Sequence, residues 1–251
     1  MADEKIPFTT HLEELRRRII ICLIAVVAGF LLSYNFADDI FALLVKPLKE
    51  QLPPESWLIF TGLTEAFVVY LKLALYAGLI LASPVILWEM WCFVAPGLYD
   101  HEKKYVFPFV ISASVLFFAG VTFCYLVVFP FSFKFFMSYS TDTLKPLPAM
   151  KEYLSFAFQI LLAFGIIFEL PVFILFLAKL GLVTERMLRR QRKFAIVIIF
   201  IVAAILTPPD VFSQCLMAIP LLILYEISVI VARVFGRKNE PGQAGEARDA
   251  V

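Results

Sequence analysis

Glu169 has the most unusual surroundings of any ionisable residue in the chain, because it lies in the apolar stretch FGIIFELPVF at residues 164–173. A charge at the centre of a bilayer costs about 3 kcal/mol on insertion scales. Such a carboxyl group is expected to face other helices or a water-filled recess. It either acts in function there, or it is a structural group that hydrogen-bonds to a neighbouring helix.

Two further carboxylates lie beside basic and aromatic residues. Glu14 in HLEELRRR (residues 11–18) is one helical turn from Arg18, and Glu102 lies in the aromatic-rich WCFVAPGLYDHEKK (91–104). Carboxylates next to apolar surface suit a ligand that carries arginines and an apolar segment, because Arg binds carboxylate in a bidentate manner and Lys does not. Glutamates at helix ends also commonly cap or pair with neighbours, so both interpretations stay open.

Enzyme and metal motifs are missing from the sequence. HEKKY lacks the second histidine of HExxH, and neither GxSxG nor a P-loop occurs. The four cysteines form no CxxC pair. We therefore predict no catalytic residues, no metal site and no cofactor.

The composition is that of an integral membrane protein. Of the 251 residues, 61% are apolar and only 17% are charged, whereas soluble domains run nearer half and a quarter. Twenty-seven phenylalanines would be hard to bury in one aqueous core. The net charge of +1 gives no general attraction to nucleic acid.

Six apolar stretches predict six transmembrane helices in an all-α fold. The motif TPPD at residues 207–210 divides the last long apolar region into two helices, because prolines and an aspartate break a lipid-embedded helix. The first stretch follows three arginines like a signal peptide, but no small-residue cleavage site follows it, so the helix is expected to stay. The predicted spans are residues 19–36, 66–88, 105–129, 153–180, 194–206 and 211–232.

Basic residues predict the orientation of these helices. Sixteen Lys and Arg residues lie on the side of the two termini and five on the opposite side, which places both termini in the cytoplasm. We predict one membrane domain over residues 1–235 and a disordered cytoplasmic tail over 236–251, where the sequence is polar and contains glycine.

Proline and helix length predict the shape of the bundle. Pro84, Pro171 and Pro220 each precede a strongly apolar run and could kink three helices into a concave, glove-like bundle, although prolines are also common in membrane helices. The fifth span is short and needs either membrane thinning or extension by snorkelling basic residues. Residues 38–48 predict a short cap helix along the outer surface, with Asp38 or Asp39 as its N-cap.

Four blocks of sequence together resemble one family. HLEELRRR resembles the HLxELRxR signature that opens the TatC family, the multi-spanning core of the twin-arginine protein translocase. ASPVILWEMWCFVAPGLYDHEKK is similar to that family's first cytoplasmic loop, LAFGIIFELPV to its fourth helix, and LTPPDVFSQCLMAIP to its last hairpin. The blocks keep the family's order between about residues 8 and 235.

The resemblance implies a receptor in the bacterial cytoplasmic (inner) membrane. Such a receptor binds the paired arginines and apolar stretch of twin-arginine signal peptides on folded cargo. It works with single-span TatB and TatA subunits, self-associates in a multimeric receptor complex, and nucleates a translocation site that is driven by the proton gradient. The competing hypothesis is a proton-coupled small-solute transporter that uses Glu169, but no matched repeat halves support it.

The resemblance also assigns roles to residues. Glu14 and Glu102 match the acids that face the signal's arginines, although only alignment chooses Glu14 over its neighbour Glu13. The other matches are Leu15, Arg16 and Phe93 beside that surface, Glu169 at an intramembrane polar site, Pro47 in the outer cap, and Thr207, Asp210 and Gln214 in a region that contacts partner helices.

Overall fold

The computed structural model describes residues 8–52, 58–60, 62–94, 106–141, 146–207 and 210–236. Within these ranges every regular element is a helix, and one isolated bridge pairs Ile59 with Ala149. The predicted all-α fold is therefore confirmed. The chain divides into two compact units, Met1–Phe168 and Glu169–Val251. The predicted tail lies outside the described residues, except for its first residue.

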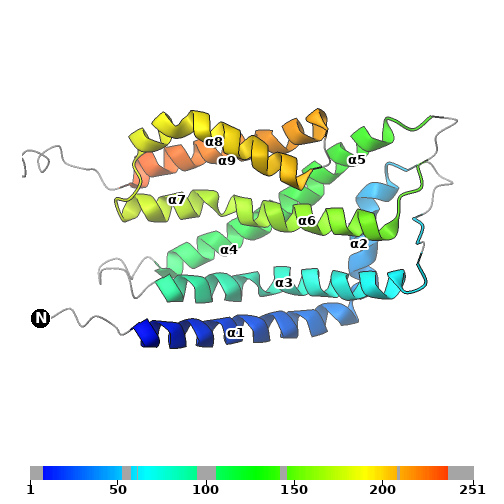
Figure 1. The fold of residues 1–251 in the computed structure, drawn as a ribbon, viewed down its shortest axis with the longest axis horizontal. Helices are drawn as coiled ribbons and strands as arrows, with labels where there is room; N and C mark the ends of the chain where they lie inside the picture. Colours follow the sequence, from blue (N-terminus) through cyan, green and yellow to red (C-terminus); the bar gives the residue numbers. More distant parts are fainter. Residues whose placement is uncertain are drawn as a thin grey trace, which may run out of the picture. The chain divides into compact units, whose positions relative to one another are not determined.

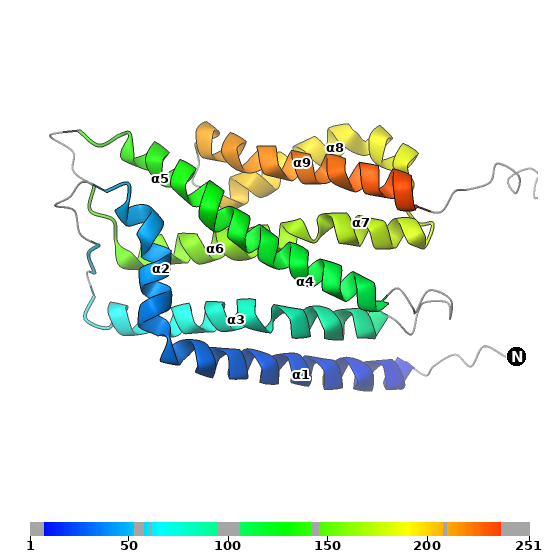
Figure 2. The same ribbon diagram turned by 180° about the vertical axis from the view of Figure 1, so that it is seen from behind.

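The first unit contains seven helical segments among its described residues (Figures 1 and 2). Helix α1 runs alongside α3, and α4 crosses α6 obliquely. Helix α4 continues through a π-helical turn, η3, into α5. The bounds are α1 Phe8–Asn35, α2 Ala37–Lys49, α3 Glu65–Val94, α4 Val106–Phe123, η3 Cys124–Val128, α5 Phe129–Met137 and α6 Met150–Phe168.

Two glycines allow α1 and α3 to touch backbone to backbone. A Cβ atom added to Gly29 would lie 2.5 Å from the carbonyl oxygen of Gly78, and one added to Gly78 would lie 2.4 Å from the backbone nitrogen of Phe30. Small residues are the usual device for close packing of membrane helices. This contact fixes the spacing of α1 and α3, and hence of the side chains that they carry at their ends.

Helix α2 leaves α1 at an angle of 81°. The predicted cap helix at residues 38–48 therefore exists, but its predicted N-cap is wrong. The N-cap residue is Phe36, which makes no side-chain capping hydrogen bond, and Asp38 and Asp39 lie inside the first turn. The chain bends two or three residues earlier than expected, so these carboxylates lie near the positive end of the helix dipole and do not cap the helix.

The second unit is a three-helix packing of α7 (Leu170–Lys179), α8 (Glu185–Leu206) and α9 (Val211–Phe235). Helix α9 contacts both α7 and α8. The core of this second unit contains Ala178, Leu188, Val229 and Ala232. The hydroxyl of Tyr225 on α9 donates a hydrogen bond of 2.7 Å to the carbonyl of Leu188, which holds the first turns of α8 against α9.

The helices overlap the predicted spans but differ from them at several ends. In the described part of the chain, four stretches are long and apolar enough to cross a membrane: Glu65–Val94, Phe107–Met137, Met150–Lys179 and Val211–Phe235. The bent pair His11–Asn35 and Ala37–Lys49 makes a possible fifth. Helix α8 starts nine residues before its apolar part, so charged turns extend the short span at 194–206. The count of six transmembrane helices stays a prediction.

The three prolines do not behave alike. Pro84 and Pro220 lie inside α3 and α9, whereas Pro171 lies in the first turn of α7, after α6 has ended at Phe168. Glu169, between these two helices, is the N-cap residue of α7. The concave bundle stays a prediction.

Candidate functional site

An ion-pair cluster joins the start of α1 to the end of α3. Arg18 donates to Oε1 of Glu14 through Nε (3.1 Å) and Nη2 (2.6 Å), and to Oε2 of Glu89 through Nη1 at 2.9 Å. Glu89 is buried, while Glu14 and Arg18 are half-buried. Two carboxylates surround one guanidinium, so the cluster carries one excess negative charge.

The geometry leaves acceptor capacity at Glu14. Both hydrogen bonds from Arg18 reach the same oxygen, Oε1, so Arg18 does not engage Oε2. A carboxylate offers about four lone-pair sites. A second guanidinium could therefore hydrogen-bond to Glu14 without displacing Arg18.

An aromatic stack borders the cluster. The rings of His11 on α1 and Phe93 on α3 lie 4.4 Å apart between centroids, with an interplanar angle of 23°. The stack and the Arg18–Glu89 pair both cross between the two helices within the last turns of α3. Together they hold the start of α1 in place.

The structure brings together part of the predicted recognition surface. Glu14, Leu15 and Phe93 are half-buried in this region, and Arg16 is exposed. Glu13 is exposed whereas Glu14 faces α3 through Arg18. Helix packing therefore favours Glu14 as the acid of this site. Glu102 lies outside the described residues.

Sequence reasoning missed Glu89 and its pairing with Arg18. The stretch SPVILWE contains Pro84, and it also places a carboxylate at the end of an apolar run. A buried acid needs a cationic partner, and three arginines at residues 16–18 offered one. That signal could have suggested the pair.

Pro47 has a specific role at the other end of the first unit. Proline has no N–H, so the carbonyl of Leu43, four residues earlier, lacks its helical donor. The hydroxyl of Tyr125 in η3 donates to that carbonyl at 2.9 Å, and the buried Tyr153 on α6 donates to the carbonyl of Leu44 at 2.6 Å. The outer helix α2 is thus fastened to η3 at the carbonyl that its proline leaves free, and to α6 at the next carbonyl along the chain.

Glu169 is half-buried at the start of α7. Its Oε1 atom is buried and has no hydrogen-bond partner among the described residues. The expected structural alternative, a carboxyl group that hydrogen-bonds to a neighbouring helix, therefore has no support at this oxygen. A buried polar atom without a partner is costly unless water or a ligand meets it.

The hairpin between α8 and α9 is built by the residues predicted for partner contact. Thr207 donates through its hydroxyl to the carbonyl of Ala203 at 2.8 Å, and Gln214 donates to that of Phe200 at 3.0 Å. Asp210 caps α9 by accepting a hydrogen bond of 2.7 Å from the backbone N–H of Ser213. Residues 208 and 209 lie outside the described part of the chain.

Among the described residues, no group of three His, Cys, Asp or Glu side chains could hold a metal ion.

Many large apolar side chains are exposed. Leu23, Val27 and Leu31, for example, lie along one face of α1. Apolar surface of this extent is typical of contact with lipid. Fold and site together define a multi-spanning helical membrane protein in which two carboxylates surround one guanidinium at the start of α1 and the end of α3.

Comparisons with known proteins identify the family. The profile of the family described as Sec-independent protein translocase protein (TatC) matches residues 10–220. The TatC protein of Desulforapulum autotrophicum is 50% identical over 248 residues, which cover 99% of this chain and 92% of that protein. The TatC protein of Escherichia coli K12 is 43% identical over 237 residues, covering 93% and 92%.

A crystal structure of the twin-arginine translocase receptor TatC matches with a TM-score of 0.81 and 40% identity, over 90% of this chain and 100% of that one. The chain therefore belongs to the TatC family. It is a core subunit of the twin-arginine protein translocase in a bacterial membrane, and it is not an enzyme.

Proposed function

We propose that the paired ends of α1 and α3 form the surface that binds the arginines of twin-arginine signal peptides. In this proposal Glu14 accepts one signal arginine through its Oε2 atom, and Glu102 accepts the other. Leu15, Arg16 and Phe93 border the bound peptide. The apolar part of the signal passes beside the His11–Phe93 stack.

One observation carries this proposal: a guanidinium already lies between two carboxylates at this end of the unit. Arg18 contacts Glu14 at 2.6 Å and Glu89 at 2.9 Å, and a negative charge remains in excess. Arginine binds carboxylates through a planar fork that lysine lacks. A site of this type therefore discriminates paired arginines from paired lysines of equal charge.

The proposal also includes the orientation of the chain, its partners and the residues that contact them. Both termini lie in the cytoplasm and six helices cross the inner membrane within a single domain, residues 1–235, followed by a disordered tail at 236–251. Single-span TatA and TatB subunits and further copies of the chain are the partners. Their helices contact Glu169 and the hairpin of Thr207, Asp210 and Gln214, while Pro47 maintains the outer cap.

The test is binding of a labelled twin-arginine signal peptide to the purified full-length protein, beside a twin-lysine peptide of otherwise identical sequence. Glu14→Gln should weaken the arginine peptide by about tenfold, because one charge-assisted hydrogen bond contributes about 1.5 kcal/mol. The matched control Glu13→Gln removes an adjacent, exposed carboxylate and should change binding less than twofold.

Equal affinity for the two peptides, with and without the TatB-type subunit, would contradict the proposal. Selectivity that emerges only with that subunit supports a site that both proteins share. The family assignment favours the translocase subunit over the alternative of a small-solute transporter. Glu169 is accordingly assigned to contact with a partner helix or an inserted signal.

A further inference from the structure

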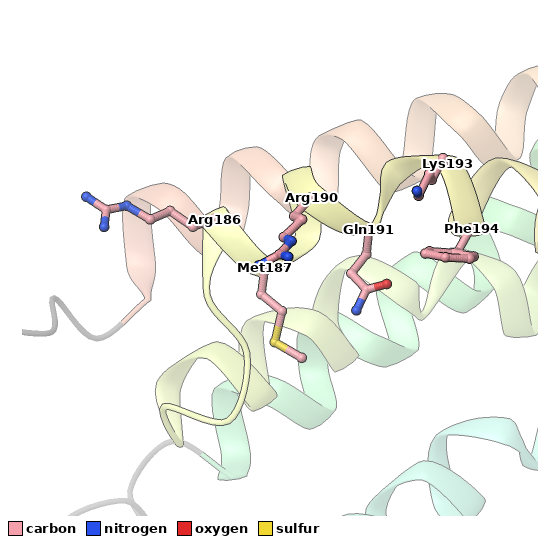
Figure 3. A pocket seen from close by; sticks show the side chains of 6 residues that line it. All are labelled: Arg186, Met187, Arg190, Gln191, Lys193 and Phe194. Atoms are coloured by element: carbon pink, nitrogen blue, oxygen red, sulfur yellow. The ribbon is translucent and has the colours of Figure 1, made fainter.

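A basic hollow of about 560 Å³ lies along the first turns of α8 (Figure 3). All of its lining side chains come from this helix. The Arg186 side chain extends away from the other five, while Met187, Arg190 and Gln191 extend toward the same side of the helix (Figure 3). The lining residues are Arg186, Met187, Arg190, Gln191, Lys193 and Phe194.

Among the described residues, no carboxylate compensates the charge in this hollow. Two other arginines of α8 have acidic partners, Arg189 with Glu185 and Arg192 with Glu226, each at 2.7 Å. The basic side chains of the hollow, at residues 186, 190 and 193, pair with no carboxylate among the described residues. They also lie near the positive end of the helix dipole, which makes their proximity less favourable still. All three side chains are exposed, so they are accessible to an anion from outside the protein.

The apolar surface below the hollow indicates which kind of anion binds. Arg186, Arg190 and Lys193 are spaced at i, i+4 and i+7, and Val197 and Ile201 continue the same helical face. Val197 is 57% exposed and Ile201 is 54% exposed. Ile201 lies about 12 Å along the axis from Lys193, within the thickness of about 15 Å of one hydrocarbon leaflet. One face therefore offers cations for a headgroup and, directly after them, an apolar track for an acyl chain.

We propose that this hollow binds the phosphate headgroup of an anionic phospholipid at the cytoplasmic side of the membrane. The arginines bind the phosphate, and Gln191 hydrogen-bonds to the headgroup glycerol. Phe194, whose ring lies 5.1 Å from Nζ of Lys193, covers the start of the acyl chain. Basic pockets at this side of membrane proteins are suited to such headgroups. The bound lipid holds the start of α8 at the membrane surface.

The test is native mass spectrometry of the full-length protein, released from micelles of a non-ionic detergent and titrated with phosphatidylglycerol. Phosphatidylcholine with the same acyl chains is the matched lipid. The protein variants are Arg186→Gln/Arg190→Gln, which alters the hollow, and Arg189→Gln/Arg192→Gln, which removes two equal charges from the same helix but outside the hollow. Thermal unfolding of each variant checks that it is folded.

The wild-type protein should bind phosphatidylglycerol more tightly than phosphatidylcholine. The hollow variant should bind phosphatidylglycerol about 30-fold more weakly, because it lacks two basic residues that attract anionic lipid. The control variant should change it less than threefold. If the hollow variant does not fold, the single substitution Lys193→Gln should give a loss of about fivefold.

Three results would overturn the proposal. Equal losses in both double variants would mean that only net charge matters. Displacement of the lipid by soluble glycerol 3-phosphate at similar concentration would identify a site for free phosphate. Displacement by a glutamate-rich peptide would instead identify a docking site for an acidic protein.

Discussion

Replacing Arg18 with glutamine should destabilise the first unit far more than replacing Glu89 with glutamine. At 2.9 Å and an effective dielectric constant of about 20, the attraction between the two charges is about 6 kcal/mol before desolvation is subtracted. Arg18→Gln leaves Glu89, whose side chain is 11% exposed, charged and without its cation. Breaking a buried pair in this way costs about 3 kcal/mol, the low end of the usual range because Arg18 is partly exposed.

Glu89→Gln has a milder effect, because the amide oxygen still accepts a hydrogen bond and Arg18 keeps Glu14 as its counter-charge. We expect a loss of about 1 kcal/mol. In the double variant no buried charge is left unpaired, so it should recover about half of the stability that Arg18→Gln removes.

The assay is thermal unfolding in detergent micelles, followed by a thiol-reactive dye. Cys124 is buried in the same unit, and the half-buried Cys22, Cys92 and Cys215 are replaced by serine in every protein so that the dye reports on Cys124. A loss of 3 kcal/mol corresponds to a fall in Tm of about 6–12 °C for a chain of this length. Equal shifts for the two single variants, or strictly additive shifts in the double variant, would refute the charge-pairing argument.

Three other perturbations test separate parts of the account. Tyr125→Phe should cost about 1–2 kcal/mol of stability by leaving the carbonyl of Leu43 without a donor. Pro47→Ala should restore the lost stability of that variant, because alanine supplies the missing helical N–H. An unchanged penalty in the Pro47→Ala background would exclude this explanation. Gly78→Val should disrupt the packing of α1 on α3 and cost at least about 2 kcal/mol in the same unfolding assay, whereas an unchanged Tm would mean that the helices can separate freely. Glu169→Ala should leave membrane insertion and Tm intact while transport of a twin-arginine cargo into membrane vesicles falls; loss of folding in mild detergent would identify a structural carboxyl group.

Much of the fold could be predicted because lipid imposes long apolar helices. The predicted spans 66–88 and 211–232 begin within one residue of α3 and α9 but end six and three residues before them, and TPPD lies between α8 and α9 as predicted. Helix ends were less predictable where tertiary structure decides them. Phe36, not an aspartate, is the N-cap of α2, because the chain turns by 81° at that residue.

The site was only partly predictable, because its main contact is long-range. Arg18 and Glu89 are 71 residues apart in the sequence, and no local pattern links them. The pairing of Glu14 with Arg18 follows from helical spacing and was foreseen. That Glu14 rather than Glu13 faces α3 depends on the packing of α1 on α3, since the rotation of a helix about its axis is set by its neighbours.

The most direct test of signal recognition is a double-mutant cycle between Glu14 of the receptor and the first arginine of the signal peptide. Affinities are measured for the wild-type protein and Glu14→Gln, each with an arginine peptide and with a peptide that has glutamine at that position. The account predicts a coupling energy of about 1.5 kcal/mol, since each change removes the same charge-assisted hydrogen bond. A coupling near zero, with both single changes weakening binding, would mean that Glu14 and the signal arginine do not meet.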